Sequence, residues 1–167
     1  MSGTDNLTPI LLGILTAAQA QLTIPVSSAR LEPGNFVAWD KCNSNECGQL
    51  YVRVISLIGS IGQNNPSRHP CAPTYGCRIG VGTVRCAHVV QDDGTFPTDA
   101  ELIVDVTEMG QDRADILQAL SCDVAPLLPE SSRIGYKVEQ WLPAGPQGGC
   151  HTGEWTIFFN LNICFNC

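Results

Sequence analysis

The chain has 167 residues, with nine Lys and Arg against 16 Asp and Glu and a formal net charge of −7 at pH 7. This length fits one domain with one hydrophobic core, so we expect a single domain over 1–167. A hydrophobic fraction of 44% excludes an intrinsically disordered chain, and the acidic balance disfavours duplex nucleic acid and anionic membranes as partners, because both bind clustered Lys and Arg.

The first half of the chain predicts one helix and two strands. Apolar residues at helical spacing predict a helix over 10–22, with Thr8 as its N-cap and Pro9 in its first turn. The segment before it has no Lys or Arg, so we do not expect a signal peptide. A short apolar run over 36–39 predicts an extended segment, and longer runs predict strands over 47–58 and 77–90.

The first long strand has apolar residues on both faces, which predicts a central strand covered on two sides. In the second, Gly80 and Gly82 indicate a bend or a close backbone approach. The segment 59–76 between them is rich in Gly, Asn, Pro and Ser. We expect a long loop there, because it is too long for a simple turn.

The second half predicts a helix followed by two strands. Thr98 and Glu101 have capping-box spacing, and Pro126 and Pro129 end the helical region. The buried stripe of this helix is expected to contain Val106, Met109, Gly110, Ile116, Leu117 and Leu120. Strands are expected over 134–142 and 155–164, joined as a hairpin by a long loop rich in Gly and Pro over 143–153. The order of elements predicts an α+β fold: a mostly antiparallel sheet of four to five strands with two helices packed on it.

The nine cysteines are an odd number, so complete internal pairing would leave one thiol over. Disulfides are one interpretation, with the candidates Cys42, Cys47, Cys71, Cys77, Cys150, Cys164 and Cys167. A structural zinc site is the other, although only the pair at the chain end has the usual short spacing. Cys86 and Cys122 are interpreted as small buried apolar residues.

Catalytic motifs are missing from the sequence: it has no nucleophile elbow, no phosphate-binding loop and no zinc-protease motif. We therefore expect no catalytic residue, no cofactor and no metal site. The enzymatic alternative is a thiol centre made by Cys86 and His88 on one strand face, with His151 in a Gly-rich loop as a further histidine. The carboxylates around the start of the second helix fit capping and the helix dipole better than a metal site: Asp92, Asp93, Asp99, Glu101, Asp105 and Glu108.

An aromatic segment rich in Pro and Gly suggests a binding surface instead. Trp is favoured where interfaces bury large amphipathic side chains. The interface candidates, in the two expected loops and next to them, are Tyr75, Arg68, Trp141, Pro143, Pro146 and Trp155. The alternative is that the tryptophans only close the end of the sheet.

Several segments together resemble one family. They are 36–54, 92–98 with the helix that ends at 121–122, 141–150 and 153–156, and they spread over about 36–160. They resemble small structural proteins of actinobacteriophage tail-assembly modules, most of all the tail terminator (neck) proteins of long-tailed phages.

The resemblance implies a mixed α/β subunit that forms a homohexameric ring, caps the tail tube and joins it to the head-side connector. The implied partners are further copies of the chain, the major tail tube protein and the head-side connector or stopper. DNA would pass through the ring without specific binding, and no membrane is involved. The implied location is the neck of the virion, after assembly in the bacterial cytoplasm. A stopper or a connector adaptor of the same particle is the alternative.

Overall fold

The computed structural model describes residues 5–34, 37, 48–59, 74–133 and 135–162. Its five strands form one sheet in the order β1-β2-β3-β5-β4. The strands are β1 (Ser28–Glu32), β2 (Gln49–Gly59), β3 (Thr74–Cys86), β4 (Lys137–Gln147) and β5 (Cys150–Asn162). β1 pairs with β2 in parallel, and every other pair is antiparallel. The predicted α+β fold with a mostly antiparallel sheet is confirmed.

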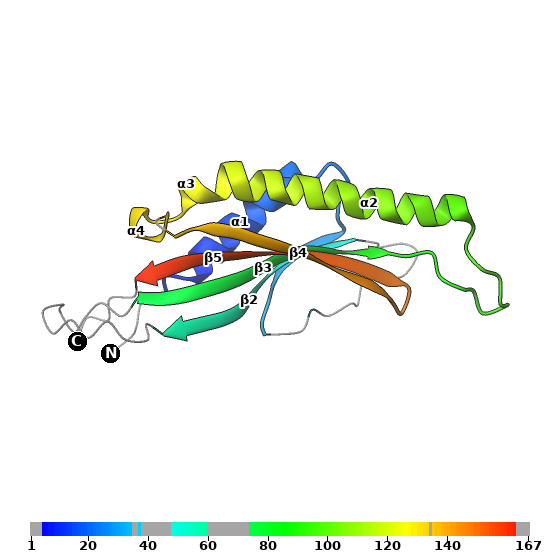
Figure 1. Cartoon of the computed structure of the whole chain (residues 1–167), viewed down its shortest axis with the longest axis horizontal. Coiled ribbons are helices and arrows are strands. Elements are labelled where there is room, and N and C mark those ends of the chain that lie inside the picture. Colours follow the sequence, from blue (N-terminus) through cyan, green and yellow to red (C-terminus); the bar gives the residue numbers. More distant parts are fainter. Residues whose placement is uncertain (1–4, 35–36, 38–47, 60–73, 134, 163–167) are drawn as a thin grey trace, which may run out of the picture.

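The helices are α1 (Thr8–Gln21), α2 (Asp99–Gln118), α3 (Ala125–Leu127) and α4 (Glu130–Arg133). A π-helical segment, Ala119–Val124, joins α2 to α3. In Figure 1, α2 runs along the length of the sheet and α1 lies beneath its C-terminal part. Buried residues of α1, of α2 with its π segment, and of the sheet form one apolar core, so both helices cover the same sheet face.

β5 shows how the sheet builds this core. Trp155, Ile157, Phe159 and Leu161 face the helices, as the alternating pattern predicts, and Ile157 and Phe159 are fully buried. The opposite face of β5 carries Glu154, Thr156 and Asn160, with Phe158 as its one large apolar residue. The prediction that β2 is covered on two sides holds for its first four residues, which are all buried. Beyond them it is wrong, because the second face presents Arg53 to Glu154 and not to an apolar layer.

The sequence predicts the N-terminal cap of α2 correctly but not that of α1. α1 has no side-chain cap from Thr8. Instead, the Asp5 carboxylate accepts the N–H groups of Leu7 at 3.0 Å and of Thr8 at 3.1 Å. The capping box of α2 is confirmed: the Glu101 N–H donates to the Thr98 hydroxyl at 3.3 Å, and the Thr98 N–H donates to the Glu101 carboxylate at 2.7 Å.

The expected loop over 143–153 is wrong. β4 and β5 run through most of it as a hairpin, and the two glycines between the strands both have positive φ, 58° at Gly148 and 79° at Gly149. Two successive residues of this kind fit a tight primed turn. Pro143 and Pro146 lie in β4, which is an edge strand, where a missing N–H costs no ladder hydrogen bond.

Two further boundaries differ from the prediction. β3 ends at Cys86, so 87–90 is not strand. β1 lies in a stretch for which the sequence predicts no strand. Of the extended segment expected over 36–39, only Val37 is among the described residues, and it packs against Tyr51, Val84 and Cys150.

Candidate functional site

Helix α2 turns carboxylates toward the sheet. Asp112, fully buried, accepts two hydrogen bonds of 2.8 Å from the Arg85 guanidinium of β3. The same guanidinium donates to the carbonyls of Ile24 at 2.8 Å and Pro25 at 2.7 Å. One turn further on, Asp115 accepts the Thr23 N–H at 2.7 Å. These carboxylates therefore tie α2 to β3 and to the segment after α1, which is a structural task.

Closer to the start of α2, Asp105 binds His88, which lies two residues after the end of β3. Its carboxylate accepts the His88 N–H at 2.8 Å and lies 2.7 Å from His88 Nδ1. This contact raises the pKa of His88. His88 lies beyond the end of β3 and turns to α2, so the expected strand-face pairing with Cys86 does not describe it.

His151 lies on β5, not in a Gly-rich loop, and it is register partner to Arg85. It is 4% exposed, and neither ring nitrogen has a hydrogen-bond partner. Burial lowers its pKa, against the opposing influence of Asp105, Glu108 and Asp112. The residue is thus a neutral imidazole beneath the carboxylates of α2.

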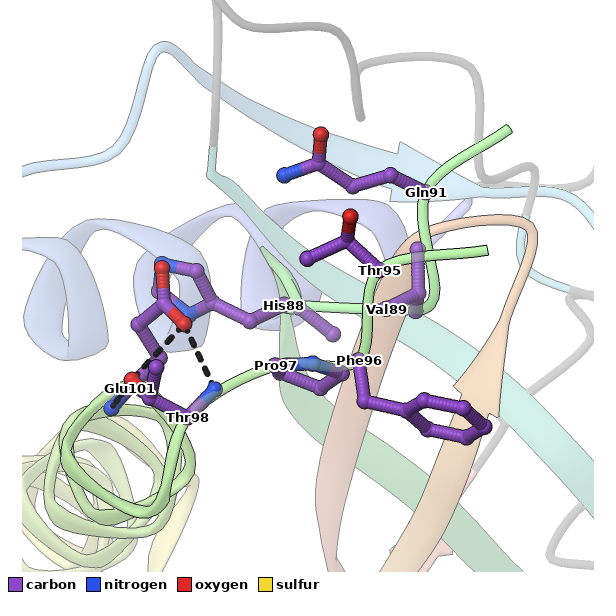
Figure 2. Close-up of a pocket in the computed structure, with 9 residues that line it drawn as sticks. His88, Val89, Gln91, Thr95, Phe96, Pro97, Thr98 and Glu101 are labelled. Atoms are coloured by element: carbon purple, nitrogen blue, oxygen red, sulfur yellow. Dashed lines mark hydrogen bonds between the residues drawn. The ribbon is translucent and has the colours of Figure 1, made fainter. Parts of the chain in front are cut away.

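A hollow of about 390 Å³ lies beside His88, in the connection between β3 and α2. A turn at Gly94 shapes this connection: the Gln91 N–H donates to the Thr95 carbonyl at 3.0 Å and the Gly94 N–H to the Gln91 carbonyl at 2.9 Å. Figure 2 shows Glu101 and Thr98 joined at the start of α2, and Phe96 directed away from His88. Phe96 is 76% exposed. The connection therefore presents a large apolar side chain to the outside.

The outer side of α2 is apolar where the inner side is acidic. Leu102, Ile103 and Val106 are all exposed, Ile103 by 65% and Val106 by 72%. They line a shallow groove of about 480 Å³ with Asp99 and Thr107. The expected buried stripe is confirmed for Ile116 and Leu120 but is wrong for Val106 and Leu117, which are exposed. We call Leu102, Ile103 and Val106 the outer face of α2.

The sequence carried a signal for this reversed arrangement. Asp105, Glu108 and Asp112 share one side of a helix because their spacing is three and four residues, and Ile103 and Val106 lie away from them. The hydrophobic periodicity of this helix, taken alone, predicts that its apolar side faces the core. Arg85, which takes Asp112 into the interior, lies 27 residues away along the chain and could not be paired with it in advance.

The tryptophan candidates lie on the helix side of the sheet. The Trp141 and Trp155 rings contact each other with centroids 5.7 Å apart, and both pack against the core. The Trp155 indole N–H donates to the Arg113 carbonyl of α2 at 2.8 Å. This favours the structural reading of both tryptophans over the interface reading.

The other interface candidates do not form one surface with them. Pro143 and Pro146 are exposed on the β4 edge, and Tyr75 is half-buried at the start of β3. Arg68 lies outside the described residues.

The structure corrects three predictions about the cysteines. Cys77 is a buried free thiol and not a disulfide cysteine, and burial raises its pKa to about 12. Cys122 is free and exposed rather than buried. Cys150 is disulfide-bonded, and so is Cys86, which the sequence suggests to be a thiol. The remaining disulfide candidates lie outside the described residues: Cys42, Cys47, Cys71, Cys164 and Cys167.

On the polar sheet face, two ion pairs border a hollow of about 500 Å³. The Arg53 guanidinium contacts the Glu154 carboxylate at 2.6 and 2.8 Å, across β3, and Arg78 contacts Glu139 at 2.9 Å. Gly80 lies under the first pair: a Cβ there would come within 2.3 Å of the Glu154 carboxylate. The close approach expected at this glycine is confirmed.

No group of three or more His, Cys, Asp or Glu side chains among the described residues is placed to hold a metal ion. No helix in the described ranges is both long and apolar enough to cross a membrane. Comparison with protein-family models and with curated proteins gives no match.

Proposed function

We propose that this chain is a structural subunit of a phage tail, a tail terminator that caps the tail tube as a homohexameric ring and joins it to the head-side connector. The observation that carries an assembly role is the outer face of α2. Three neighbouring apolar side chains are exposed on a helix whose acidic side is turned inward. Such a patch loses its contact with water only when another protein covers it, which is typical of an interaction surface.

The resemblance supports the narrower identity. Three of the segments that carry it are 92–98, 141–150 and 153–156. In the structure these form the connection before α2 and the outer part of the β4–β5 hairpin. Figure 1 draws both at the same end of the molecule as the N-terminus of α2. These three resembling segments therefore lie toward the same end of the molecule as the start of α2.

The negative charge of the chain supports the proposal that DNA passes through the ring without binding to it. Residues 86–112 contain no Lys or Arg and seven Asp and Glu, six of which are at least partly exposed, whereas Asp112 is buried. A surface of this kind repels phosphate, which suits a conduit that DNA must leave again. The proposal includes location in the neck of the virion, assembly in the host cytoplasm and no membrane partner.

The state of the candidate reactive groups favours assembly over catalysis. A thiol centre at Cys86 needs a thiolate, and the sulfur of Cys86 is in a disulfide. His88 is held by Asp105, and Asp112 is held by Arg85. In the described part of the chain, these groups hold elements together.

The experiment is imaging of the purified protein and of the virion by electron microscopy. We expect a six-fold ring between the tail tube and the head-side connector. A ring on the head side of that position identifies the alternative, a stopper or connector adaptor. Absence of the chain from the mature particle contradicts both.

A further inference from the structure

The outer face of α2 has the shape of a site for another helix. Ile103, Val106 and Gly110 follow each other at spacings of three and four residues, which places them in one row along the helix. A Cβ at Gly110 would have no neighbour within 4 Å, so a partner can approach the helix backbone closely there. An apolar row beside a groove is how proteins receive an amphipathic helix.

The surroundings of this row are acidic. Asp99 in the first turn of α2, and Asp92 and Asp93 in the connection that leads to it, are exposed and have no cation within 4 Å among the described residues. Asp99 itself lines the groove. An occupant with Lys or Arg beside its apolar residues is attracted to such a rim, and an acidic occupant is repelled.

A second copy of the chain offers few Lys and Arg residues for this acidic surface. Its net charge is −7. Four of the described cations pair with carboxylates: Arg30, Arg53, Arg78 and Arg85. The described cations without such a partner are Arg113, which lies on α2 itself, Arg133 and Lys137. The negative charge around the N-terminal part of α2 is therefore better complemented by a different protein.

We infer that the outer face of α2 receives a basic amphipathic helix of a protein other than this chain. The apolar residues of that helix contact Leu102, Ile103 and Val106, and its Lys and Arg contact the acidic rim. The inference deepens the proposed function, on which it rests for the existence of a partner in the neck.

The test uses two synthetic helical peptides with the same Leu positions, one with Lys and one with Glu at the remaining sites. Binding to the purified chain is measured by fluorescence anisotropy at low and high salt. We expect the Leu/Lys peptide to bind, with an affinity that falls as salt is added, and the Leu/Glu peptide to bind at least ten-fold more weakly. Equal binding of both peptides, or no binding of either, overturns the inference.

A variant pair locates the contact. Ile103→Gln with Val106→Gln removes the apolar row and keeps good helix formers. Leu12→Gln makes the same change at an exposed residue of α1 and serves as the control. We expect at least a ten-fold loss of Leu/Lys binding in the double variant and no change in the control, with circular dichroism confirming that both are folded. Unchanged binding in the double variant overturns the inference.

Native mass spectrometry of the same samples separates this inference from the proposed function. A hexamer that persists in the double variant while peptide binding is lost supports both. A hexamer that falls apart in the double variant shows that a second copy covers this face, and overturns the inference. A monomer that still binds the Leu/Lys peptide through this face supports the inference and contradicts the ring.

Discussion

His151 is the clearest case of a single residue whose surroundings set its chemistry. It is buried on β5, with Arg85 as its register partner and with Asp105, Glu108 and Asp112 of α2 acting on its charge. Since neither ring nitrogen is hydrogen-bonded, the cost of burying a charged imidazole outweighs the attraction of these carboxylates. The native state therefore keeps it neutral, with a pKa below 6.5.

This predicts a loss of stability in mild acid. The unfolded chain binds a proton at His151 below about pH 6.5 while the folded chain does not, so the free energy of unfolding falls as the pH drops through this value. The contribution of this residue is at most about 1.4 kcal/mol per pH unit. Urea unfolding from pH 7.5 to 5 measures it, and His151→Gln is expected to flatten the slope.

The pKa of His88 is shifted in the opposite direction to that of His151. Asp105 raises the pKa of His88 in the folded chain. The protonated His88 therefore stabilises the fold below the pKa that it has in the unfolded chain, and this stabilisation is lost as the pH rises through its pKa in the folded chain. In the same titration, His88→Gln is expected to make the acid loss steeper. Identical pH profiles for both variants would contradict these assignments.

The buried pair of Arg85 and Asp112 gives a prediction about stability. Asp112→Ala leaves the Arg85 charge inside the protein without its carboxylate, so we expect a loss of about 3–5 kcal/mol in the free energy of unfolding. Glu139→Ala breaks the exposed pair with Arg78 and is expected to change stability little. Chemical denaturation compares the two, and equal losses would show that Asp112 is not a buried ion-pair partner.

The two free thiols are expected to differ in reactivity. Cys77 is buried with a pKa of about 12, so it has almost no thiolate at neutral pH, whereas Cys122 is exposed. Brief maleimide treatment of the native protein, followed by peptide mapping, should label Cys122 and spare Cys77 until the chain is unfolded. Rapid labelling of native Cys77 would place it at the surface.

At the scale of the elements, glycine has different roles in β3 and α2. A Cβ at Gly82 would come within 2.3 Å of the Gly153 carbonyl, which is backbone and cannot turn away. We expect Gly82→Ala to cost roughly 1–3 kcal/mol. Gly110→Ala meets open space and is expected to add about 1 kcal/mol, because alanine is the better helix former. Thermal unfolding of both variants tests the pair, and a destabilised Gly110→Ala would contradict it.

The elements that the sequence predicts well are those with strong local signals. The capping box of α2, the alternation along β5 and the two glycines of β3 are all read from short-range pattern. β1 is missed because its five residues gain their strand conformation from the parallel partner β2. The β4–β5 hairpin is predicted, but its strands run further than predicted, because prolines in β4 indicate a loop unless the strand is known to lie at an edge.

At the scale of the whole molecule, the site could not be read from pattern because it depends on long-range pairing. Burial of Asp112 by Arg85 turns the acidic side of α2 inward and leaves Ile103 and Val106 outside. The tryptophans, which sequence reasoning favours as interface residues, instead contact each other and α2. The surface available to a partner is therefore on the helix rather than on the aromatic hairpin.

The central claim is that the chain works by assembling with copies of itself and with neighbouring tail proteins. Native mass spectrometry of the purified chain, alone and with the tail tube protein, tests this most directly. We predict a species at six times the 17.9 kDa chain mass. A chain that remains a monomer under both conditions would contradict the account.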